Sequence, residues 1–80
     1  MRLYEFKAKW IARLGAFSPA SEEEAKMVEN VVNKLSYLRA MNLPNLAHTA
    51  YLITRDNQAS PQLKQMMKEM LRDIAEVKTE

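Results

Sequence analysis

The 80-residue chain has no cysteine, one glycine and three prolines. The lack of cysteine excludes a disulfide framework and any thiolate zinc site. Because a secreted domain of this size usually depends on such cross-links, we expect a cytoplasmic protein. The single glycine, Gly15, excludes a glycine-rich phosphate-binding loop. The scarcity of both chain breakers favours helices.

Long apolar runs are also missing. No stretch is long enough to cross a membrane as a helix. Lys7, Lys9 and Arg13 interrupt any apolar core that a secretory signal would need. The formal net charge is only +2, which is a weak argument for binding nucleic acid. The basic character lies at the start of the chain, where Arg2, Lys7, Lys9 and Arg13 outnumber Glu5.

The composition that is present is that of an ordered globular chain. Apolar residues make up 48% of it and charged residues 28%. A chain of 80 residues makes one small domain, residues 1–80, and buries only about 60% of its unfolded surface on folding. Such a domain is stable only if it packs well or associates.

The prolines mark expected helix starts. Ser60–Pro61 fits an N-cap followed by the first helical position. Ser18–Pro19 fits the same pattern, but an alternative start has Ser21 as the cap and Glu24 closing a capping box. A third, weaker start lies around Pro44.

Hydrophobic periodicity predicts helices after these starts. The helix expected over residues 20–41 has its apolar stripe at Met27, Val28, Val31, Val32, Leu35 and Leu38. The helix expected over residues 61–77 has its stripe at Leu63, Met66, Met67, Met70, Leu71, Ile74 and Val77. A shorter stripe predicts a third helix between them, at Leu43, Leu46, Ala47, Ala50 and Ile53.

The opening segment fits two periods. With period two, one face of a strand is formed by Tyr4, Phe6, Ala8 and Trp10. With the helical period, a stripe is formed by Leu3, Phe6, Trp10, Leu14 and Phe17, although Lys7 falls inside it. We favour the helix because the chain offers no partner for a lone strand. The predicted fold is an all-α bundle of three or four helices, and the alternative is a β-strand over residues 3–10 followed by helices.

No pattern of catalytic or metal-ligating residues emerges. The only histidine, His48, cannot build a common zinc site without cysteines, and we expect it on the surface. The acidic run from Glu22 to Glu24 fits a solvated helix start that complements the helix dipole. No carboxylate sits in an apolar setting that would raise its pKa. We therefore predict a protein that is not an enzyme and has no cofactor, metal site or small-molecule substrate.

The methionines of the last expected helix suggest a binding surface. Met66, Met67 and Met70 share one stripe, which is typical either of an adaptable partner-binding face or of an ordinary core. With two wide apolar stripes and no catalytic group, the sequence predicts a protein–protein interaction module. We expect it to act as a regulator or adaptor and to self-associate as a homodimer.

The alternative function is binding of nucleic acid or of an acidic surface through the opening segment. Its cations are Arg2, Lys7, Lys9 and Arg13, and Trp10 would stack on bases. Against this, a domain this small needs its aromatic residues as core. A helix-turn-helix over residues 28–55 is disfavoured because the segment after Pro44 offers no cation before Arg55.

Overall fold

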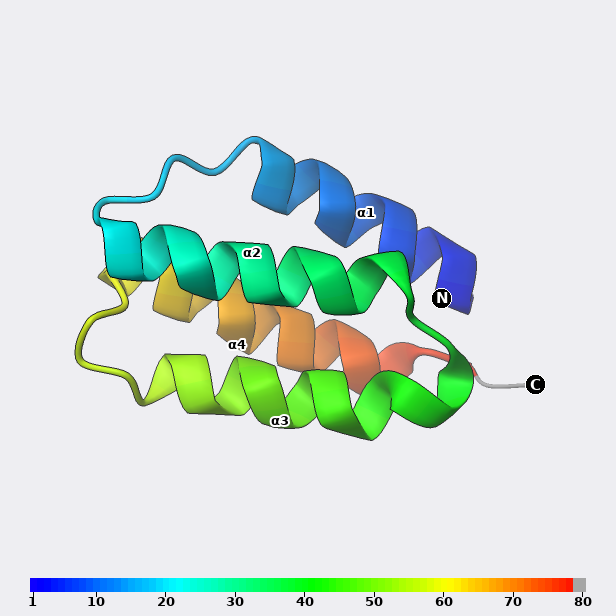
Figure 1. Cartoon of the computed structure of the whole chain (residues 1–80). Coiled ribbons are helices and arrows are strands. Elements are labelled where there is room, and N and C mark those ends of the chain that lie inside the picture. Colours follow the sequence, from blue (N-terminus) through cyan, green and yellow to red (C-terminus); the bar gives the residue numbers. More distant parts are fainter. Residues whose placement is uncertain (79–80) are drawn as a thin grey trace.

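The computed structural model describes residues 1–78 and contains four α-helices in that range (Figure 1). They are α1 (Leu3–Gly15), α2 (Glu22–Ser36), α3 (Leu43–Thr54) and α4 (Pro61–Glu76), with a short 3₁₀-helix, η1 (Ala40–Asn42), before α3. Each helix runs antiparallel to the one before it, in an up-down-up-down bundle. The prediction of an all-α bundle is confirmed. The alternative strand over residues 3–10 is wrong, because α1 occupies that segment.

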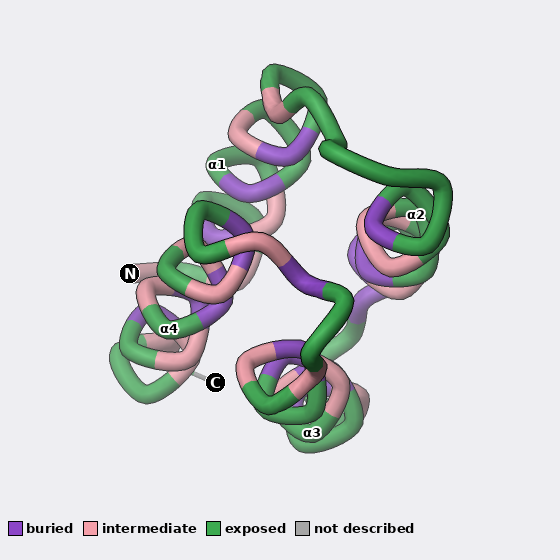
Figure 2. The backbone as a smooth tube through the Cα atoms, turned by 90° about the vertical axis from the view of Figure 1, so that its left-hand side faces the viewer, coloured by how far each residue is buried: buried purple, intermediate pink, exposed green. Residues whose placement is uncertain are grey.

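The helices stand at the corners of a bundle and turn their buried positions inward (Figure 2). The core draws on all four helices: Phe6, Trp10, Leu14, Val31, Leu35, Leu38, Leu43, Leu46, Ala50, Ile53, Ala59, Leu63, Met67 and Met70. The closest backbone pairing is between α3 and α4, whereas α1 and α4 approach each other at few points. Long side chains therefore have to fill the space between α1 and α4.

The opening segment is helical because of where its large side chains point. Phe6 and Trp10 have no exposed surface, so they lie on the inner side of α1 together with Leu14. A strand would have placed Tyr4 and Ala8 on the same face as Phe6, but both are exposed. The helical stripe lets one element supply three large core residues to a domain that has few aromatics.

Side-chain caps fix the starts of α2 and α4. Ser21 Oγ accepts a hydrogen bond from the Glu24 N–H at 3.1 Å, and Ser60 Oγ accepts one from the Leu63 N–H at 3.2 Å. Pro61 takes the first position of α4, as predicted. The predicted start at Ser18–Pro19 is wrong and the alternative cap at Ser21 is confirmed, because α2 begins at Glu22. Glu24 does not close the predicted capping box, because its carboxylate accepts from the Ala20 and Ser60 N–H groups.

The two ends of the described chain lie together. The Lys78 N–H donates to the Met1 carbonyl at 2.9 Å, and Arg2 and Lys78 form an isolated parallel bridge. This pairing ties the start of α1 to the end of α4. Within residues 1–78, none of the helices combines the length and the apolar composition that a membrane crossing requires.

Candidate functional site

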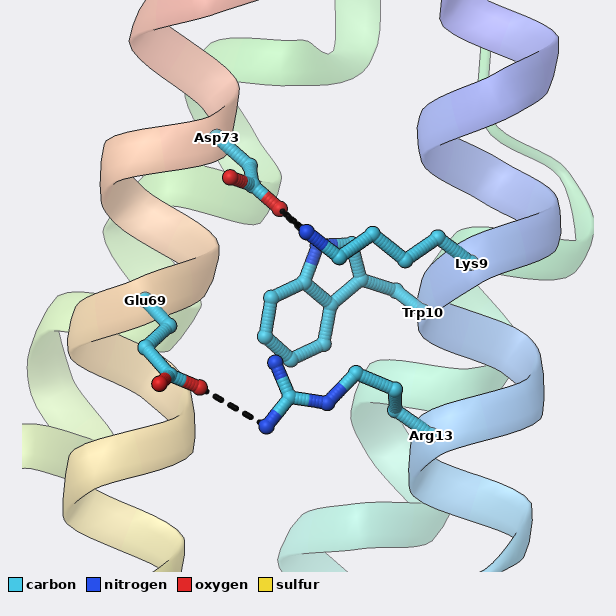
Figure 3. Close-up of polar contacts among 5 residues, drawn as sticks. All are labelled: Lys9, Trp10, Arg13, Glu69 and Asp73. Atoms are coloured by element: carbon cyan, nitrogen blue, oxygen red, sulfur yellow. Dashed lines mark hydrogen bonds and ion pairs between the residues drawn. The ribbon is translucent and has the colours of Figure 1, made fainter.

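A polar cluster bridges α1 and α4, and we call it the α1–α4 cluster (Figure 3). Asp73 Oδ2, on α4, accepts hydrogen bonds from Lys9 Nζ at 2.6 Å and from Trp10 Nε1 at 2.9 Å. The Arg13 guanidinium lies over the Trp10 ring at 4.6 Å, and its Nη2 is 2.7 Å from Glu69 Oε2. The Arg13–Glu69 contact is an ion pair without the alignment of a hydrogen bond.

Asp73 is held in its charged form. Burial by itself raises the pKa of this carboxyl, but the hydrogen bonds from Lys9 and Trp10 and the positive charges of Lys9 and Arg13 outweigh it, so the pKa lies below its ordinary value. A carboxylate that stays ionised and has two donors on one oxygen cannot serve as a proton donor near neutral pH. The α1–α4 cluster therefore joins two helices that are spaced too widely for close backbone packing.

The residues predicted to bind nucleic acid do not form one surface. Trp10 is fully buried, so it cannot stack on a base. Lys9 and Arg13 point at carboxylates of α4, which neutralise much of their charge. Arg2 is exposed and Lys7 is half-buried. The aromatic part of the predicted site is wrong, because the small core takes the only tryptophan.

The methionines of α4 lie mostly inside the bundle. Met67 and Met70 are fully buried, and Met66 is half-buried at the edge of the core. The structure thus places the predicted partner-binding stripe against the other helices. Only Met66 retains appreciable surface.

Glu24 corrects the prediction of a wholly solvated acidic run. It is buried, whereas Glu22 and Glu23 are exposed. Its Oε2 accepts the Ser60 N–H at 2.6 Å and its Oε1 accepts the Ala20 N–H at 3.0 Å. Burial by itself raises the pKa of Glu24. The hydrogen bonds from Ala20 and Ser60 outweigh this effect, so the pKa lies below its ordinary value. This carboxylate therefore fastens the start of α2 to the start of α4.

A cleft between α2 and α3 is the feature that the sequence analysis did not anticipate. It has a volume of about 370 Å³ and is lined by Asn30, Asn33, Lys34, Tyr37, Leu38, Asn42, Asn45 and Leu46. We call it the α2–α3 cleft. Its α2 wall is a helical stripe with i, i+3, i+4 and i+7 spacing, from Asn30 to Tyr37. Its opposite wall comes from η1 and the start of α3.

The walls of the α2–α3 cleft carry hydrogen-bonding groups over an apolar floor. Leu38 and Leu46 are buried, while the amides of Asn30, Asn33 and Asn45 are exposed. Each amide offers a carbonyl acceptor and two N–H donors, and it does not titrate. This chemistry suits recognition of polar groups and supplies neither a general base nor a nucleophile.

Among the residues that line the cleft, Lys34 is the charged one. Residues 30–55 contain no aspartate or glutamate, but they contain Lys34, Arg39 and Arg55. That acid-free run and the asparagine spacing were the signals in the sequence that could have located the cleft. His48 lies on the exposed side of α3, which confirms its predicted surface position.

Comparison of the chain with protein-family models, with curated proteins and with solved structures gives no match. Within residues 1–78, His, Asp and Glu side chains form no group that could hold a metal ion. The fold and the site together define a small four-helix bundle with an amide-lined cleft on one side.

Proposed function

We propose that the chain is a non-enzymatic protein-interaction module, a small cytoplasmic regulator or adaptor, that binds its partner through the α2–α3 cleft and the corner beside it. The observation that carries this proposal is the position of the exposed apolar side chains. Of the six large ones in residues 1–78, Tyr37 and Met41 lie at the corner beside the cleft, directly after α2 and in η1, whereas Tyr51 and Leu52 lie towards the other end of α3. Tyr37 lines the cleft itself.

Tyr37 and Met41 are the most exposed of these side chains, at 79% and 81% of their surface. Tyrosine and methionine are enriched in protein interfaces, and clustered apolar exposure marks interaction sites more often than scattered exposure does. The amides of the cleft add hydrogen-bonding groups beside this apolar corner. Together they resemble the apolar centre and polar rim of a protein interface.

The charge of this face supports an acidic partner rather than a second copy docked on the same face. A two-fold contact centred on the cleft would place the Lys34 side chains of both copies in the same interface, and like charges repel. The methionines that motivated the expected homodimer lie largely in the core. Self-association therefore stays a prediction from the sequence.

Site-specific photo-cross-linking in cells that express the chain tests the proposal. We expect p-benzoylphenylalanine at position 37 to give one discrete adduct with another protein. The control position is Gln65, which is exposed on α4, diagonally across the bundle from α2 (Figure 2). Equal labelling from both positions would contradict the proposed face. An adduct of twice the chain's own mass from position 37 would replace the proposed partner with a second copy.

A second candidate function, binding of nucleic acid, rests on the end of the bundle where Met1 and Lys78 meet. A cleft of about 590 Å³ there is lined by Met1, Arg2, Leu3, Tyr4, Glu5 and Lys78. Arg2 and Lys78 are cations, and Tyr4 is exposed enough to stack on a base. A salt titration of single-stranded DNA binding checks it, since the affinity should fall steeply with salt and with Arg2→Ala. Salt-independent binding, or none, rules it out.

A further inference from the structure

We infer that the α2–α3 cleft holds an acidic peptide segment in an extended conformation and recognises it through the peptide backbone. This inference rests on the proposed function and adds the chemistry of the partner. Asn30 and Asn33 are spaced three residues apart on α2, and Asn42 and Asn45 are spaced three residues apart on the facing wall. Asn42 Nδ2 donates to the Tyr37 carbonyl at 3.4 Å, so the exposed amides that face each other across the cleft are Asn30 and Asn33 on one side and Asn45 on the other.

The amides of the cleft match the needs of a peptide backbone. Each residue of an extended segment presents one N–H donor and one C=O acceptor, and a single asparagine amide can pair with both. A helical partner has already satisfied most of these groups internally, so the amides could pair only with its side chains and its end groups. The groups lining the α2–α3 cleft therefore favour an extended segment over a docked helix.

The dimensions and the floor fit a short segment. The stripe from Asn30 to Tyr37 spans seven helical steps, or about 10 Å, which is the length of about three residues of extended chain. Alternate side chains of such a segment point in opposite directions. One would point down onto Leu38 and Leu46, and its neighbours would point out towards the rim.

The positive charges beside the cleft favour acidic residues in the bound peptide segment. Lys34 is half-buried in the wall of the cleft, and Arg39 is exposed on the chain between α2 and η1. A separate hollow on α2, which shares Asn30 and Asn33 with the cleft, is lined by Lys26 and Glu29. The end nearest Tyr37 is therefore the acid-free end, where an aspartate or glutamate of the partner can pair with Lys34.

Fluorescence anisotropy with pooled peptides tests the inference. The probes are short fluorescein-labelled libraries that carry Asp or Glu at every second position, a matched library with Lys or Arg, and the acidic library with N-methylated backbone amides. We expect the full chain to bind the acidic library, and to bind the basic and N-methylated libraries at least about tenfold more weakly. Equal binding of the N-methylated library would overturn backbone recognition.

Asparagine variants place the binding in the cleft. Asn33→Asp should weaken binding of the acidic library by about tenfold, since it removes a donor and adds a repelling charge. Asn57→Asp is the matched control, because Asn57 is exposed in the loop before α4 and outside the cleft. Asn45→Ala is a second variant that changes no charge, and it should also weaken binding. Loss of affinity in Asn57→Asp, or none in both cleft variants, would overturn the inference.

The outcomes separate this inference from the proposed function. If position 37 cross-links to a protein while the acidic library fails to bind, the proposed function stands and the acidic segment falls. If a single-stranded oligonucleotide competes with the acidic library and loses affinity with Asn33→Asp, the cleft accepts polyanions in general, and the peptide inference is overturned.

Discussion

Asp73 holds two groups of α1 with a single carboxylate oxygen. Oδ2 accepts from both Lys9 Nζ and Trp10 Nε1, and Trp10 is the largest fully buried side chain. A buried indole N–H that lost its acceptor would carry a desolvation cost. Asp73 thereby lets the core use a tryptophan between α1 and α4, the neighbouring helices whose backbones approach each other at the fewest points.

Asp73→Asn should destabilise the fold by about 1–3 kcal/mol, because it removes the charge that Lys9 and Trp10 stabilise. The matched control is Glu69→Gln, since the Arg13–Glu69 pair is more than one-third exposed and we expect less than about 1 kcal/mol from it. Urea denaturation followed by circular dichroism measures both. Equal losses in the two variants would show that Asp73 has no special part in α1–α4 packing.

Acid should weaken the fold through Asp73 and Glu24. Both carboxyls have a pKa in the folded chain below the ordinary value, which is about 4. Their stabilisation is therefore present above the unfolded pKa and is lost as the pH falls through the folded pKa. We expect the free energy of unfolding to fall below about pH 5 and to fall less steeply in the double variant Glu24→Gln/Asp73→Asn. Denaturation curves across a pH series measure this, and an unchanged slope would count against it.

At the scale of the element, the starts of α2 and α4 show how much of the structure the sequence predicts. The apolar stripes and the Ser60–Pro61 start are local patterns, and they predict the helices because side chains three and four apart share a face. Two equally good caps at Ser18 and Ser21 could not be ranked, because the choice depends on Glu24 reaching Ser60, 36 residues away. The residues next to Ser18 and Ser21 in the sequence do not predict that contact.

The α1–α4 cluster and the α2–α3 cleft depend on contacts between distant residues even more than the helix starts do. Trp10 and Asp73 are 63 residues apart, so the apolar stripe of the opening segment indicates that Trp10 is buried but does not reveal that its indole N–H is hydrogen-bonded to Asp73. The α2–α3 cleft arises from how two helices are spaced, and hydrophobic periodicity does not report spacing. Its asparagines were readable as a pattern, but only the fold puts Asn42 and Asn45 opposite Asn30 and Asn33.

The methionines of α4 separate core from surface within one helix. Met67→Ala should cost about 2–5 kcal/mol because Met67 is fully buried. Met66→Ala should cost only about 1 kcal/mol, since Met66 is half-buried. Chemical denaturation at matched protein concentration measures both. Similar small costs for the two variants would mean that Met67 is not a core residue in solution.

At the scale of the whole molecule, the two sides of the bundle differ in how far their polar groups are already paired within the chain. The α1–α4 side is closed by Trp10 and two ion pairs, which absorb Lys9 and Arg13. The α2–α3 side is more open, carries Tyr37 and Met41, and belongs to a stretch with no acidic residue. Binding is proposed on the second side because its polar and apolar groups still face solvent.

The most direct test of that assignment is the response of the asparagine side-chain amides in a ¹⁵N-labelled chain to the acidic peptide library. We predict that the NMR signals of Asn30, Asn33 and Asn45 shift as the library is added, while the signal of Asn57 stays in place. Shifts at Asn57, or no asparagine shift together with backbone amide shifts confined to Arg2, Leu3 and Tyr4, would contradict the α2–α3 cleft as the binding site.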